Sequence, residues 1–169
     1  MSLVDSIIDK TVEIALSGRS RIATCAAYGV SCEGWLKTEL LHALDEALTT
    51  SSEVEVLPEA KNIDLTVRTR TEQVLLELKT FPTNYGRSGK PITNFIDGVL
   101  GDLRKLARLR GSTGIGLAIW MAYVIPDPVP TPWAGHVAKI QAVAAGTRRD
   151  ERIPLWENAF ANLYIMNSR

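Results

Sequence analysis

The chain has 169 residues, of which 46% are hydrophobic and 22% are charged, so its composition is that of one globular domain rather than a disordered segment. Nineteen basic residues balance nineteen acidic ones, which excludes the strongly basic surface of a protein that coats nucleic acid; any basic patch must be local. The two cysteines, Cys25 and Cys32, do not have the spacing of a paired metal site, and we expect them to be reduced core residues.

The longest apolar stretch, residues 115–126, is too short to span a bilayer. The N-terminal residues lack the charged and apolar regions of a signal peptide. We therefore expect a cytoplasmic protein with no membrane partner.

Apolar periodicity and turn residues predict the elements in chain order. Helices are predicted at 3–16, 33–48, 92–110 and about 134–145, with a further short helix possible around 21–28. Strands are predicted at 53–57, 61–68, 72–80, 115–125 and near 160–166, and a loop with two glycines and two prolines at 81–91.

The first three strands are joined by short turns, which indicates an antiparallel meander. A crossover helix and a fully buried strand follow, so the order predicts an α/β (α+β) fold with a mixed central sheet and helices on both faces. We expect a single domain over 1–169, with a core at about 33–125 and a C-terminal helix and strand within 134–166.

The third strand of the meander carries two charged residues among apolar ones. Because side chains alternate along a strand, Glu77 and Lys79 share one face with Leu75, and the intervening apolar residues take the other. Charged groups in such a setting cost free energy unless they are paired or bind a metal.

The preceding strand carries Asp64. A hairpin with its turn near 69–71 pairs positions whose numbers sum to about 140, so Asp64 is predicted to lie opposite residue 76 and next to Glu77. Two carboxylates this close can bind one divalent cation, and hard oxygen ligands favour Mg²⁺ or Mn²⁺.

Asp64 followed by Glu77-Leu78-Lys79 resembles the PD-(D/E)xK motif of restriction-endonuclease-like nucleases, although Asn62-Ile63-Asp64 stands where the motif has Pro-Asp. The order of elements from about residue 33 to 125 is similar to the core of that superfamily. The resemblance implies a metal-dependent nuclease acting on nucleic acid, with DNA the favoured substrate. Asp64, Glu77 and the Leu78 backbone carbonyl would be metal ligands, and Lys79 would orient or deprotonate the attacking water or stabilise the phosphate.

The superfamily often places one acidic residue of the leading helix at the metal site. Glu39 lies at the edge of that helix's apolar stripe, so we expect it to be a catalytic residue and metal ligand. Glu33 is the competing choice, but an acid in the first turn also complements the helix dipole.

Nucleic-acid contacts are expected from two places. The loop after the catalytic strand carries Tyr85, Arg87 and Lys90, and Lys105 lies on the following helix. By analogy, a core of this size is expected to work as a homodimer or within a complex. The alternative is a catalytically inactive nuclease-like domain that serves as a binding or assembly module.

Overall fold

The computed structural model describes residues 2–48, 54–83, 85, 91–111 and 114–169. One mixed six-stranded sheet organises the described residues, in the order β1-β2-β3-β4-β6-β5. Its strands are β1 (Glu55–Pro58), β2 (Leu65–Arg68), β3 (Gln73–Pro82), β4 (Gly114–Pro126), β5 (Gly146–Trp156) and β6 (Ala159–Asn167). The strands β3 and β4 are parallel and every other neighbouring pair is antiparallel.

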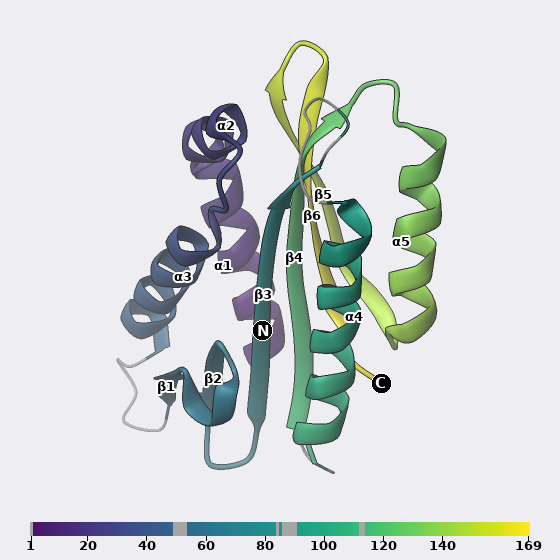
Figure 1. The fold of residues 1–169 in the computed structure, drawn as a ribbon. Helices are drawn as coiled ribbons and strands as arrows, with labels where there is room; N and C mark the ends of the chain where they lie inside the picture. Colours follow the sequence, from purple (N-terminus) through teal and green to yellow (C-terminus); the bar gives the residue numbers. More distant parts are fainter. Residues whose placement is uncertain (1, 49–53, 84, 86–90, 112–113) are drawn as a thin grey trace.

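Helices cover both faces of this sheet (Figure 1). One face is covered by α1 (Leu3–Ser17), α2 (Arg19–Tyr28) and α3 (Glu33–Leu48), and the other by α4 (Ile92–Leu109) and α5 (Thr131–Val143). The predicted mixed sheet between two helical layers is therefore confirmed. None of the described helices is long and apolar enough to cross a membrane.

The two helical layers make separate cores, and β3 contributes to both. Its residues Val74, Leu76 and Leu78 pack in the core beneath α1, α2 and α3, whereas Leu75 packs beneath α4 and α5. This alternation confirms the predicted assignment of faces along the strand. It leaves the side chains of Glu77 and Lys79 on the α4 side.

The second strand of the meander begins later than the sequence predicted. Residues 61–64 are not a strand, because a short 3-10 helix, η1 (Ala60–Asn62), precedes β2 and both Glu59 and Asn62 have positive φ. The Glu59 N–H donates to the Asp64 carbonyl over 3.1 Å and closes this loop. Asp64 therefore lies just before β2 rather than within it.

Sequence periodicity did not predict β5. This strand forms the outer edge of the sheet, and its first five residues are exposed, so the alternation of apolar and polar residues is lost. The register also shifts twice along its pairing with β6.

Candidate functional site

The candidate site lies where β2 stops covering the edge of β3. The ladder between these strands runs from Arg68↔Gln73 to Leu65↔Leu76, so β3 continues beyond the end of β2. Two carboxylates accept hydrogen bonds from the backbone of this edge, which β2 does not cover. The Leu78 N–H donates to Asp64 Oδ2 over 2.9 Å, and the Thr80 N–H donates to Glu33 Oε2 over 3.2 Å.

The start of α3 is attached to the same edge, which explains why Glu33 reaches it. The Cys32 N–H donates to Thr80 Oγ1 over 3.1 Å, and the Ser31 hydroxyl donates to the Thr80 carbonyl over 3.2 Å. Ser31 Oγ also accepts the Glu33 N–H over 3.2 Å, as an N-terminal capping residue does. These contacts fix the first turn of α3 beside β3.

Asp64 also pairs with a lysine of α3. Lys37 lies one turn after Glu33, and its Nζ donates to Asp64 Oδ1 over 3.3 Å and to Glu59 Oε1. The hydrogen bond that Lys37 donates to Glu59 is the main cause of the raised pKa of Lys37. One carboxylate oxygen of Asp64 therefore accepts a hydrogen bond from the β3 backbone, and the other accepts one from the Lys37 ammonium group.

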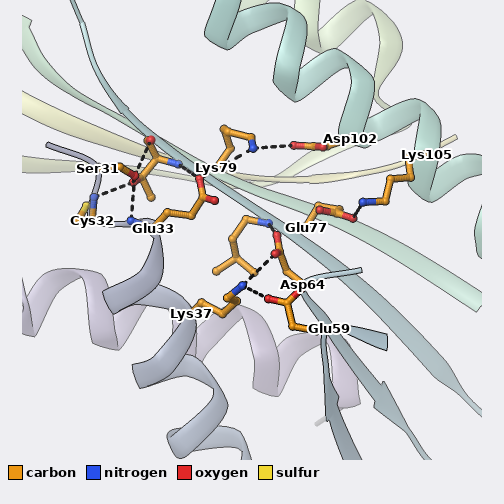
Figure 2. A network of polar contacts seen from close by, with 12 residues as sticks. Ser31, Cys32, Glu33, Lys37, Glu59, Asp64, Glu77, Lys79, Asp102 and Lys105 are labelled. Carbon is orange, nitrogen blue, oxygen red and sulfur yellow. Dashed lines mark hydrogen bonds and ion pairs between the residues drawn. The ribbon is translucent and has the colours of Figure 1, made fainter. Parts of the chain in front are cut away.

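Glu77 is the most buried acid of the site, with 6% of its surface exposed. Its Oε1 forms an ion pair with Lys105 Nζ from α4 (Figure 2). Burial raises the pKa of the Glu77 carboxyl to about 7; the Lys105 ammonium opposes this rise, and the nearby charges of Asp64 and Asp102 add to it. The charges of Asp64 and Asp102 therefore disfavour ionisation of Glu77.

Lys79 lies between two acids on different helices. Its Nζ is 3.8 Å from Asp102 Oδ2 on α4 and 4.0 Å from Glu33 Oε2 on α3. Asp102 Oδ2 is buried and accepts no hydrogen bond within the described residues. Burial raises the pKa of Asp102, and the ammonium groups of Lys79 and Lys105 oppose this rise.

The site as a whole has more acids than bases, as Figure 2 shows. Five carboxylates alternate with three ammonium groups: Glu33, Glu59, Asp64, Glu77 and Asp102 with Lys37, Lys79 and Lys105. With every group ionised, two negative charges remain in excess. A region of this charge attracts cations.

Glu39 does not lie in this network. Its Oε1 accepts from Arg21 over 2.6 Å and from the Trp35 indole over 3.2 Å, so it links α2 to α3. The structure thus corrects the choice between the two acids of the leading helix, because Glu33 lies at the site. The physical reason is the attachment of the start of α3 to Thr80, which leaves Glu39 almost two turns away.

The expected nucleic-acid contacts have mixed outcomes. Arg87 and Lys90 lie outside the described residues. Tyr85 is partly buried and packs against the core beneath α4, where burial raises its pKa. Lys105 lies in the site itself, as the partner of Glu77.

The donor set suits a hard divalent cation in its chemistry, and two observations bear on its fit. Asp102 Oδ2 is buried and accepts no hydrogen bond among the described residues, as expected of a group that can accept a cation, whereas Glu77 Oε1 already has the Lys105 ammonium as its partner. The Leu78 carbonyl is on the same strand edge as its N–H, and therefore on the side of Asp64. However, the described residues contain no group of three or more His, Cys, Asp or Glu side chains arranged to hold a metal ion. In the network, the lysines lie between the carboxylates.

Sequence reasoning missed the part that Asp102 plays. It assigned Lys105 to nucleic-acid contact and linked neither residue to Glu77 or Lys79. The signal available was the spacing of the two residues, three positions apart on one helix face.

Comparisons of the chain with protein-family models, curated proteins and solved structures found no match. Any functional interpretation therefore depends on the residues and geometry of the site.

Proposed function

We propose that the protein is a metal-dependent phosphodiesterase that cleaves nucleic acid, with DNA as the favoured substrate. The observation that carries this proposal is the hydrogen bond from the Leu78 N–H to the Asp64 carboxylate, which holds Asp64 at the point of β3 between Glu77 and Lys79. The sequence resembles the PD-(D/E)xK motif at the same three residues.

The arrangement of the elements supports the same proposal. The leading helix α3, the β1-β2-β3 meander, the helix α4 and the parallel strand β4 follow the order of a restriction-endonuclease-like core. Asp64 lies just before the second strand of that meander, and Glu77 and Lys79 lie on the third.

In this proposal Asp64, Glu77 and the Leu78 carbonyl hold Mg²⁺ or Mn²⁺. The bound cation would lower the pKa of a water molecule and stabilise negative charge on the phosphate. Asp64 is held in place by the Leu78 N–H, and Glu77 by its position on a buried strand. Such preorganisation fixes both carboxylates before substrate arrives.

Lys79 has the role of the positive group next to the scissile phosphate. Glu33 and Asp102 hold its ammonium from two sides, so its position does not depend on substrate. An ammonium held this way donates hydrogen bonds to the attacking water or to a phosphate oxygen. We therefore replace Glu39 with Glu33 and Asp102 as the acids that complete the site.

One observation favours the alternative of a catalytically inactive binding module. Asp64 and Glu77 already have lysine partners, and no three-ligand metal cluster is present among the described residues. A network of this kind also stabilises a fold without any metal. In that case the domain would bind nucleic acid or a protein partner without cleaving it.

The two candidates differ in metal binding and in the residues on which activity depends. We expect calorimetry to detect Mg²⁺ binding to the wild type that is lost in Asp64→Asn, and a panel of single- and double-stranded DNA and RNA to include a substrate cleaved with Mg²⁺. Cleavage should be abolished by Asp64→Asn and Lys79→Met, and retained by Glu39→Gln, which alters an acid of α3 outside the network. Absence of Mg²⁺ binding by the wild type would reject the enzyme and favour the binding module.

A further inference from the structure

The ion pair of the most buried acid of the site involves a residue outside the nuclease-like motif. Lys105 comes from α4 and contacts Glu77 Oε1, an oxygen that the proposed function assigns to the cation. Glu77 is 6% exposed, and a buried carboxylate is costly unless a positive group accompanies it. Lys105 therefore meets, in the metal-free protein, the need that a divalent cation would meet.

We propose that Lys105 is an exchangeable counter-ion of Glu77: it neutralises this carboxylate in the metal-free protein and leaves it when a divalent cation binds. This inference rests on the proposed function, because it takes Glu77 as a metal ligand. It goes further by naming the group that competes with the cation and by giving a reason why ammonium groups lie between the carboxylates of the site.

The two partners differ in their freedom to move. Glu77 is in the middle of β3, between the two cores, and pairs in register with Ala118 of β4. The Lys105 side chain is 27% exposed on the surface of α4. A lysine has a long flexible stem and a strongly hydrated ammonium, so its release into water costs far less than exposing Glu77. Of the two, Lys105 is the one that moves.

Lys105 remains beside the site after it is released. Asp102 lies one helical turn before it, and the charges of these two residues already influence each other. The freed ammonium is then available to a phosphate oxygen of a bound nucleic acid, a contact that Lys makes as a point charge. Binding of the cation and of the substrate would thus be coupled through one side chain.

Mg²⁺ affinity provides the first test. Calorimetry at about pH 8.5, above the pKa of about 7 of Glu77, compares the wild type with Lys105→Met and Lys79→Met. Both variants remove one positive charge from the site, but only Lys105→Met releases Glu77. We expect Lys105→Met to bind Mg²⁺ on the order of tenfold more tightly than the wild type, and clearly more tightly than Lys79→Met.

Two results would refute the role of Lys105 without affecting the proposed function. The first is an Mg²⁺ affinity of Lys105→Met no higher than that of the wild type. The second is an equal gain of affinity in Lys79→Met, which would show a general effect of charge. If none of the three proteins binds Mg²⁺, the metal site is absent and the proposed function fails with this inference. The failures of the two hypotheses are therefore distinguishable.

A second measurement uses the wild type and does not depend on the folding of a variant. Lysines are acetylated with an N-hydroxysuccinimide ester, with and without saturating Mg²⁺, and the rate at each position is read by peptide mass spectrometry. We expect Mg²⁺ to increase the rate at Lys105 severalfold. Lys10 is the control, because it pairs with Glu13 on α1, outside the site. An unchanged rate at Lys105 in a protein that binds Mg²⁺ would refute its displacement.

Discussion

The Asp64 carboxylate accepts a hydrogen bond of 2.9 Å from the backbone N–H of Leu78. This contact joins the residue before β2 to the part of β3 that β2 does not cover. A candidate catalytic acid is thus also a structural partner of the strand that carries the other motif residues. Stability and metal binding should therefore respond differently to different substitutions of Asp64.

Asp64→Asn and Asp64→Ala separate these two contributions. The amide oxygen of Asn can still accept from Leu78, whereas Ala leaves that N–H without its acceptor. We expect urea unfolding to show a loss of about 1–3 kcal/mol for Asp64→Ala and a smaller loss for Asp64→Asn. Calorimetry should show that both variants lose Mg²⁺ affinity. Equal losses of stability in the two variants would mean that the hydrogen bond between Leu78 and Asp64 does not stabilise the fold.

The central part of the site was predictable because it depends on local geometry. Alternation along β3 places Glu77 and Lys79 on one face, and the pairing of a short hairpin, which ends at Leu65↔Leu76, brings Asp64 beside the next part of β3. These relationships require only the period of a strand and the position of a turn. The mixed sheet was predictable for a similar reason, since short connections imply antiparallel neighbours and a crossover helix allows a parallel one.

The remaining residues depend on how helices are placed against the sheet. A helical period gives the direction of Glu39 around α3 but not the position of α3 along β3, which the contacts of Cys32 and Ser31 with Thr80 determine. Asp102 and Lys105 reach the site only because α4 crosses β3 at their level. Such placements result from packing between distant segments, and the sequence pattern of one helix does not contain them.

Glu33 and Glu39, the two candidate acids of α3, provide a matched pair for testing this correction. Glu33→Gln removes a negative charge 4.0 Å from Lys79, and we expect Mg²⁺-dependent cleavage to fall by about tenfold as the ammonium loses one of its supports. Glu39→Gln should leave cleavage unchanged. Because the pair of Glu39 with Arg21 is exposed, its loss should cost no more than about 1 kcal/mol in urea unfolding. Loss of cleavage in Glu39→Gln but not in Glu33→Gln would show that Glu39, rather than Glu33, belongs to the site.

Two glycines test the packing of α4 against β4. A Cβ at Gly116 would lie 2.9 Å from Leu106 Cβ and 2.3 Å from Ser168 Oγ, so we expect Gly116→Ala to destabilise the protein by about 1–3 kcal/mol. A Cβ at Gly101, inside α4, would meet no heavy atom within 4 Å. Gly101→Ala should stabilise the protein by about 0.5–1 kcal/mol through helix propensity. Urea unfolding measures both, and a similar effect of the two changes would contradict the packing described.

The burial of Glu77 predicts how stability depends on pH. Its pKa is about 7 in the folded protein and has an ordinary value of 4.5. Between these values the folded state binds more protons than the unfolded state, so this carboxyl makes stability fall as pH rises. The stabilising contribution of the Glu77 carboxyl to the free energy of unfolding is fully present below about pH 4.5 and is lost above about pH 7. The change is on the order of 3 kcal/mol.

Glu77→Gln isolates this contribution, because Asp102 also has a raised pKa and adds a slope of the same sign. We expect urea unfolding at about pH 5 and about pH 8 to show a clearly smaller decrease in Glu77→Gln than in the wild type. Glu13→Gln is the control, since Glu13 is an exposed residue on α1 that pairs with Lys10. Its pH dependence should match that of the wild type. If Glu77→Gln matched it too, Glu77 would be ionised at little cost in the folded protein, and the surrounding lysines would be compensating its burial in full.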